Sequence, residues 1–481
     1  MTCKAFKDPA LDVLYWQIPS LANLLMCMPR NLWSLNNEEP IVLSFCRTML
    51  RADWIVLQSY ALRLRSIYAD EPVKMLVDSD ALSAVSHYSG TNLLPNLREL
   101  RLYHESTCDD LLLRNIVHVP QIYLAPRVTT LSLSNLSSKS LHVLSVAIQR
   151  YPLLKTIRLA IRDAVGDELL EMLEGVDTLK SLCSFELVLE DKYTFPLSRM
   201  LEALGTLSHL DDILLECSNI DLALPPTFLT SDDNAPAFPA LAALYLFSNA
   251  RQIVHIMHYM RKLPSLTDIF VRFTDLIEDT SVPQAIEALT KALSAAESPI
   301  QGIDISFPET GDYSDLVSFH ALRPLFRFQQ LRSFHLTCFP PPSLDDAMLT
   351  ELARGLRKLH TLELQWKADA QTNSRPKVTF TGLRALLRHC PNLQHLSLAV
   401  DTTVPCNDDY SHTAPSVDDV CHSELKTWEV GDSLIGNADV QRVAITLATW
   451  TPHLQDIAVT AEKSSSLTSK AYNARTKAWK Q

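Results

Sequence analysis

Arg-His-Cys-Pro-Asn-Leu-Gln-His-Leu-Ser-Leu, residues 388–398, contains the pattern that decides the fold. Its core, Leu-x-x-Leu-x-Leu, recurs along the 481-residue chain in thirteen clear copies and one weaker copy that starts at Leu64. The clear copies start at Leu97, Val128, Leu154, Leu182, Leu210, Leu241, Leu266, Ile300, Leu331, Leu359, Leu393, Leu425 and Leu454. Their mean spacing is about 30 residues, and a steady period of this length predicts a solenoid of stacked repeats.

Each repeat combines the periodicities of one strand and one helix. The Leu-x-Leu ending alternates apolar and polar positions, which predicts a strand with one buried face. Before it, Leu383, Leu386, Leu387 and Cys390 follow helical spacing and share one helix face. A proline then ends many of these helices, because it lacks an N–H and clashes with the preceding turn. We therefore expect an α/β horseshoe of about 14 repeats, with parallel strands on the concave face and helices on the convex face.

The chain also resembles a known family. Residues 389–393, His-Cys-Pro-Asn-Leu, resemble the cysteine-containing leucine-rich repeat of F-box proteins, in particular the fungal F-box/leucine-rich-repeat proteins. Residues 1–16 resemble the end of an F-box. The residues that carry this second resemblance are Cys3, Lys4, Phe6, Leu11, Leu14 and Trp16. The resemblance implies an F-box truncated at its N-terminal side, followed by a leucine-rich-repeat solenoid.

Three regions are expected along the chain. Residues 1–60 form the F-box remnant and a helical N-terminal cap, residues 61–461 form the solenoid, and residues 462–481 form a basic flexible tail. An ordinary helical cap over the first repeat is an alternative for residues 1–60, and the two interpretations are compatible. Long polar loops are expected at residues 222–238, 367–377 and 401–419.

Net charge, cysteine spacing and missing motifs disfavour several classes of partner and activity. A net charge of -12 disfavours nucleic acid and anionic membranes as the main partners. The ten cysteines are scattered without a Cys-x-x-Cys pair, which favours a reducing compartment, cytoplasmic or nuclear. Motifs of phosphate-binding loops, hydrolase nucleophiles and zinc proteases are missing. Because these motifs are missing, we expect no enzyme and no cofactor. His255 and His258 share a helix face without a third ligand, so we also expect no metal site.

The concave strand positions are the candidate binding surface. Alternate residues of each strand point away from the buried face, and in the middle repeats several of these are apolar or aromatic. The candidate protein-binding residues are Asp212, Leu214, Tyr245, Phe247, Asp268, Phe270 and Arg272. Exposed aromatic residues bordered by charge are typical of protein-binding hot spots. Alternatively, the loop at residues 222–238 folds over them.

These observations favour a non-enzymatic protein-recognition module with a protein substrate on its concave face. By resemblance it is the substrate receptor, or substrate adaptor, of an SCF-type cullin ubiquitin ligase. The alternative is a free-standing leucine-rich-repeat scaffold or inhibitor without a ligase link. Because most contacts of an F-box with a Skp-type adaptor come from its missing start, we expect Skp binding only if the upstream F-box is present.

Overall fold

The structure is a computed structural model of the 481-residue chain. It describes residues 4–36, 41–68, 75–89, 93–102, 127–137, 144, 151–163, 176–189, 197–217, 238–260, 263–274, 282–295, 298–307, 319–338, 344–366, 375–404, 422, 424–431, 433, 435 and 439–458. The chain divides into two compact units, Met1–Leu241 and Ala242–Gln481.

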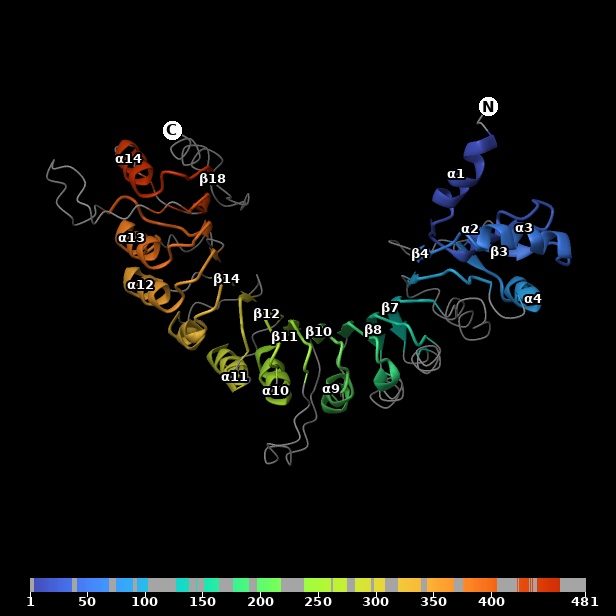
Figure 1. Cartoon of the computed structure of the whole chain (residues 1–481), viewed down its shortest axis with the longest axis horizontal. Helices are drawn as coiled ribbons and strands as arrows, with labels where there is room; N and C mark the ends of the chain where they lie inside the picture. Colours follow the sequence, from blue (N-terminus) through green and yellow to red (C-terminus); the bar gives the residue numbers. More distant parts are fainter. Residues whose placement is uncertain are drawn as a thin grey trace. The chain divides into compact units, whose positions relative to one another are not determined.

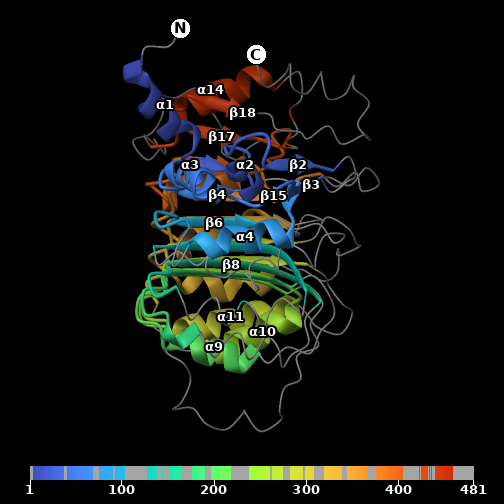
Figure 2. The ribbon, with the colours of Figure 1, turned by 90° about the vertical axis from the view of Figure 1, so that its right-hand side faces the viewer.

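The first unit contains a parallel sheet whose strands are paired in sequence order. Its strands are β1 (Gln17–Ile18), β4 (Ser66–Tyr68), β6 (Glu99–Leu102), β7 (Thr130–Ser137), β8 (Thr156–Asp163), β9 (Ser184–Leu189) and β10 (Asp212–Cys217). Each pairs with the next in parallel, and Figure 2 shows β4, β6 and β8 lying across the view in this order. Its helices are α1 (Lys7–Leu14), α2 (Leu21–Leu25), α3 (Arg51–Ala61), α4 (Ser79–Ser89) and α9 (Leu197–Gly205), with short 3-10 turns η1 (Lys4–Phe6) and η2 (Val176–Thr178).

The second unit repeats this arrangement with a helix or 3-10 segment between most strands. Its strands are β11 (Ala243–Ser248), β12 (Asp268–Phe273), β13 (Gly302–Ser306), β14 (Ser333–Cys338), β15 (Thr361–Trp366), β16 (His395–Ser397), β17 (Thr427–Glu429) and β18 (Asp456–Ala458). Between them lie α10 (Ala250–Tyr259), α11 (Val282–Ala295), η4 (Phe319–Arg327), α12 (Asp346–Gly355), α13 (Phe380–His389) and α14 (Val440–Trp450). In Figure 1 these helices lie along one side of the strands and leave the other face of the sheet open.

The predicted fold class is therefore confirmed as an α/β solenoid with parallel strands and helices alongside. The Leu-x-x-Leu-x-Leu pattern explains its core. In the copy that begins at Leu393, for example, Leu393, Leu396 and Leu398 are each no more than 2% exposed. Fully burying one such side chain contributes about 1.5–3 kcal/mol, so each repeat depends on its neighbours for stability. The weaker copy also forms a strand, β4, in which Ile67 is fully buried.

Polar side chains cap the N-terminal ends of three helices in the second unit. The carboxylate of Asp345 accepts a hydrogen bond from the N–H of Met348 at 2.8 Å, and so caps α12. Asn249 caps α10 and Thr379 caps α13 in the same way. Asp345 therefore has a structural role as the N-cap of α12.

Cysteine 390 ends α13 and links it to the preceding repeat. It is fully buried, and its thiol donates to the carbonyl oxygens of Leu356 at 3.4 Å and Ala353 at 3.7 Å. These carbonyls belong to the last turn and C-cap of α12, where helical partners are missing. The carbonyl oxygen of Cys390 lies 2.8 Å from Nε2 of buried His422, whose Nδ1 accepts from Leu425 N–H. Because Nδ1 accepts, Nε2 of His422 donates the hydrogen bond to Cys390, and this histidine has a structural role.

The N-terminal region contains a sheet that the sequence analysis did not predict. Strands β2 (Trp33–Leu35), β3 (Ile41–Phe45) and β5 (Met75–Val77) form it, with β2 antiparallel and β5 parallel to β3. The N-terminal part is consequently mixed α/β, and not only helical.

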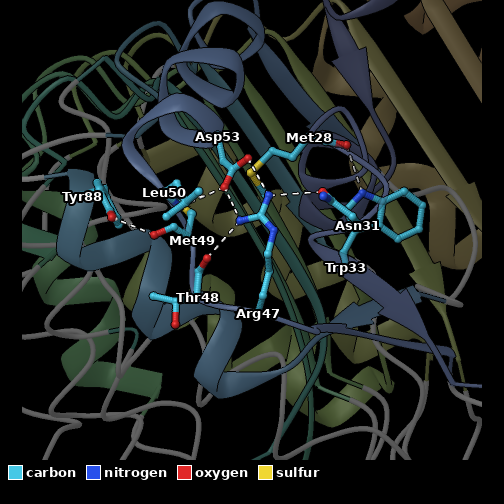
Figure 3. Close-up of polar contacts among 9 residues, drawn as sticks. All are labelled: Met28, Asn31, Trp33, Arg47, Thr48, Met49, Leu50, Asp53 and Tyr88. Carbon is cyan, nitrogen blue, oxygen red and sulfur yellow. Dashed lines mark hydrogen bonds and ion pairs between the residues drawn. The ribbon is translucent and has the colours of Figure 1, made fainter.

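An ion pair between half-buried Arg47 and buried Asp53 fixes the entry to α3 in this region (Figure 3). Asp53 is 3% exposed and accepts from both terminal nitrogens of Arg47, at 2.6 and 3.0 Å. The hydrogen bonds from Arg47 lower the pKa of Asp53. The same carboxylate accepts from the N–H of Leu50, while Tyr88 donates to the carbonyl of Met49. The bonds to Asp53 attach the segment between β3 and α3 to α3, and the bond from Tyr88 attaches it to α4.

Several predicted segments lie outside the described residues. These are the basic tail at 462–481 and most of the three predicted loops, namely residues 222–237, 367–374 and 405–419. At the start of the third predicted loop, Asp401 and Thr402 are buried. The carboxylate of Asp401 accepts hydrogen bonds from the N–H and the hydroxyl of Thr403.

Candidate protein-binding surface

The strands of the second unit bring five side chains into one row on the open face. The register pairs Tyr245 with Phe270, Phe270 with Asp304, Asp304 with His335, and His335 with Glu363. All five are half-buried, whereas the residues on either side of them in each strand are buried in the core. We call these five residues the central row.

Two aromatic rings form one end of the central row. The rings of Tyr245 and Phe270 are stacked, with centroids 4.4 Å apart and planes 7° from parallel. Phe247 and Arg272 lie beside them in the next row, paired in register on the same two strands. Phe247 is half-buried and Arg272 is exposed. The predicted residues Tyr245, Phe247, Phe270 and Arg272 therefore share one face, as the alternation of the sequence indicated.

At the other end of the central row, His335 lies between the carboxylates of Asp304 and Glu363. Nδ1 of His335 lies 3.6 Å from Asp304 and 3.8 Å from Glu363. Its Nε2 lies 2.8 Å from the hydroxyl of Ser333. The hydrogen bond to Asp304, together with the charge of Glu363, raises the pKa of His335 above 6.5 despite the opposing effect of burial. Protonated His335 would carry its charge between these two acids.

Asp268 leans toward β13 because its neighbour there is a glycine. A Cβ at Gly302 would collide with Oδ1 of Asp268, so only glycine leaves room for this carboxylate. Its other oxygen accepts from the hydroxyl of Thr267 at 2.7 Å. Asp268 and Asp304 thus lie on the side of Phe270 that faces β13.

The two remaining predicted residues, Asp212 and Leu214, belong to β10 in the first unit. Both are half-buried on its open face. Burial raises the pKa of Asp212, whose Oδ1 accepts from the hydroxyl of Ser184 at 2.7 Å.

Charged side chains of the first unit's open face form ion pairs with one another. Arg158 pairs with Glu186 at 3.0 Å, and Arg101 pairs with Glu99 while lying over the ring of Tyr68. This local neutralisation distinguishes the first unit from the second.

The residues that resemble the end of an F-box lie at the start of the chain. Cys3 and the side chain of Lys4 are outside the described residues. Phe6, Leu14 and Trp16 are 68%, 67% and 54% exposed, and Leu11 is half-buried. Helix α1 buries none of its residues. Of the eleven large apolar side chains that are exposed in the described part of the chain, eight lie between residues 6 and 88, so this end has an unusually apolar surface.

Helix α1 is held by contacts in its first turn, near its end and at the following residue Tyr15. Arg63, which follows α3, forms ion pairs with Asp8 and Asp12. The ring of Tyr15 lies 4.7 Å from that of Tyr60, and its hydroxyl accepts from the thiol of Cys27. These contacts position the helix while leaving its apolar side chains accessible.

The sequence analysis missed Asp304, His335 and Glu363, although a signal was present. When the repeats are aligned on the first apolar residue of each copy, these three and the two aromatic residues fall in the same column. Reading that column across repeats would have identified the central row.

The described residues contain no group of three His, Cys, Asp or Glu side chains arranged to hold a metal ion. His255 is half-buried on α10, and the side chain of His258 lies outside the described residues. No helix in the described part of the chain is long and apolar enough to cross a membrane. No known protein family and no curated protein matches the sequence.

Proposed function

We propose that this chain is a non-enzymatic protein-recognition module that binds a partner on the open face of its second unit. One observation carries the proposal, namely the stacked pair of Tyr245 and Phe270 on a sheet face that none of the second unit's described helices covers in Figure 1. Aromatic side chains at the centre of an interface supply large contact area at a low cost in conformational entropy, and they are enriched among hot spots.

Proximity labelling in the native cell tests this proposal. The wild-type chain is compared with the double variant Tyr245→Ala/Phe270→Ala and with Ile445→Ala, which removes an exposed apolar side chain (60% exposed) from α14 instead. We expect at least one labelled protein to be lost from the aromatic variant and retained by the control. Hot-spot truncations cost about 2 kcal/mol or more each, so the loss should be near complete. Identical labelling by all three chains would refute the proposal.

We further propose a link to an SCF-type ubiquitin ligase, in the cytoplasm or the nucleus. It rests on the resemblance of residues 1–16 to the end of an F-box and is supported by the exposed apolar side chains of Phe6, Leu14 and Trp16. An adaptor protein would bury this surface. The free-standing scaffold remains the competing proposal.

Pull-downs with a purified Skp-type adaptor distinguish the two. The bait is the 481-residue chain, and a second bait is extended upstream in frame. Capture by either bait supports the ligase link, and it should be weakened by Leu14→Asp, which places a charge on the exposed face of α1. Failure of both baits favours the free-standing scaffold.

A further inference from the structure

The open face of the second unit has an excess of negative charge. Its outward positions hold the carboxylates of Asp268, Asp304, Glu363, Glu429 and Asp456. Arg272 is the single guanidinium among the described outward positions of these strands. In the first unit, by contrast, Arg101 and Arg158 of the open face are paired with glutamates. The second unit therefore favours a cationic partner.

One face of the Phe270 ring is turned toward these carboxylates. Tyr245 stacks on Phe270 from the adjacent strand β11, so it covers the face directed to that strand. The opposite face is directed to β13, where Asp304 lies in register and Asp268 leans over Gly302. This face of Phe270 and the carboxylates of Asp268 and Asp304 thus border the same space above β12 and β13.

We propose that this face binds an extended protein segment through an arginine, whose guanidinium stacks on Phe270 and pairs with Asp304. The inference rests on the proposed recognition function and defines the chemistry of its partner. A planar guanidinium can stack on a ring and donate two parallel hydrogen bonds to a carboxylate, whereas a lysine ammonium offers only a point charge. A cation over an aromatic face contributes further attraction.

The length of the segment follows from the sheet. Neighbouring strands lie about 4.8 Å apart, so the five side chains of the central row cover roughly 19 Å. An extended chain advances about 3.3 Å per residue, and about six residues span that distance. The arginine occupies the aromatic end, and a second basic residue near the other end faces Glu363.

The protonation state of His335 changes the net charge at the Glu363 end of the central row. Asp304 on β13 and Glu363 on β15 face it from the two neighbouring strands, and Ser333 contacts it from its own strand. When His335 is protonated, it neutralises part of the carboxylate charge that the partner requires. Binding is therefore expected to be stronger at neutral pH than at mildly acidic pH.

Phage display of random dodecapeptides on the immobilised full-length chain tests the proposal. The targets are the wild type, Asp304→Asn, Asp304→Asn/Glu363→Gln and Tyr245→Ala/Phe270→Ala. Glu351→Gln is the matched control, because Glu351 is an exposed carboxylate on α12 that pairs with Arg323 away from the central row. Thermal unfolding of each variant establishes that it is folded.

We expect peptides selected on the wild type to contain arginine at least threefold more often than the unselected library. Selection on Glu351→Gln should give the same bias, and selection on the doubly neutralised variant should lose it. A selected peptide made synthetically should bind Asp304→Asn about tenfold more weakly by fluorescence anisotropy, which corresponds to about 1.4 kcal/mol. Replacing its arginine by lysine should also weaken it.

Two results would overturn the inference in distinguishable ways. Acidic or uncharged peptides that bind the wild type and are lost from the aromatic variant would refute the cationic partner and leave the recognition function standing. The absence of any selected peptide that depends on Tyr245 and Phe270 would refute both.

Discussion

The ring of Tyr245 lies parallel to that of Phe270, with 4.4 Å between their centroids, although 25 residues separate them in the sequence. Such pairs contribute about 0.5–1.5 kcal/mol beyond the area they bury. They therefore stabilise the contact between β11 and β12 as well as forming a surface.

A double-mutant cycle with Tyr245→Ala and Phe270→Ala should give a coupling free energy of about 0.5–1.5 kcal/mol in urea unfolding. Each single variant should remain folded, because both rings are only half-buried. A loss above about 4 kcal/mol for either one would place it in the core and exclude its use as a binding surface.

The pH dependence of stability should change when His335 is replaced by glutamine. The pKa of His335 is raised in the folded chain, chiefly by Asp304. Its stabilising contribution is complete below the unfolded pKa, near 6.5, and is lost as the pH rises through the folded pKa. The urea midpoints of wild type and variant should thus differ most below the unfolded pKa and converge as the pH rises above the raised, folded pKa.

Replacement of exposed His453 by glutamine provides the control for this measurement. A constant difference between wild type and His335→Gln over the whole range would show that the carboxylates do not act on the histidine. The affinity for a cationic peptide should change in the opposite direction, increasing as the pH rises.

Replacement of Gly382 by alanine should destabilise the chain, although glycine inside a helix normally costs about 1 kcal/mol relative to alanine. A Cβ at Gly382 would collide with the carboxylate of Asp346, which accepts from the N–H and hydroxyl of Thr379 at 2.7 and 2.6 Å. The collision forces α12 and α13 apart or breaks these bonds, and overpacking of this kind costs about 1–3 kcal/mol.

Urea unfolding of Gly382→Ala, Asp346→Ala and the double variant measures the effect. Because the second change removes the colliding group, the double variant should lose less stability than the two single losses added together. Stabilisation by Gly382→Ala alone would contradict the close approach of the two helices.

Buried thiols should resist alkylation in the native chain. Burial raises the pKa of Cys390 and of Cys217 to about 12, so neither forms the reactive thiolate at neutral pH. Cys46 is exposed. After brief treatment with iodoacetamide, mass spectrometry should find Cys46 modified and the two buried cysteines unmodified. Denaturant should expose all three, and rapid native labelling of Cys390 would show that the end of α13 opens.

The repeats were predictable from sequence because one period governs both the strand and the helix of each unit. Burial of the apolar residues in every copy from Leu97 to Leu425 follows directly from that pattern. The sheet formed by β2, β3 and β5 was not predictable in the same way, since its strands are short and belong to no repeat. Their pairing depends on the contact between residues 41–43 and residues 75–77, which no local pattern specifies.

The binding surface was predicted only in part, for a related reason. Tyr245 and Phe270 were recognised because aromatic residues are unusual at outward positions. Asp304 and Glu363 were not, because a carboxylate on a strand is ordinary until its neighbours are known. Their importance derives from His335 between them, and this contact requires three strands in register.

Because the strands are in register, the binding specificity of this face can evolve one repeat at a time. Each repeat contributes one side chain to the central row, and the apolar residues that hold its strand in place point the other way. A substitution at one position therefore leaves the apolar core of that repeat intact and alters only the contacts with the partner and with adjacent residues of the row. Recognition on such a face can diverge one strand at a time, with affinities that change additively for positions two or more strands apart.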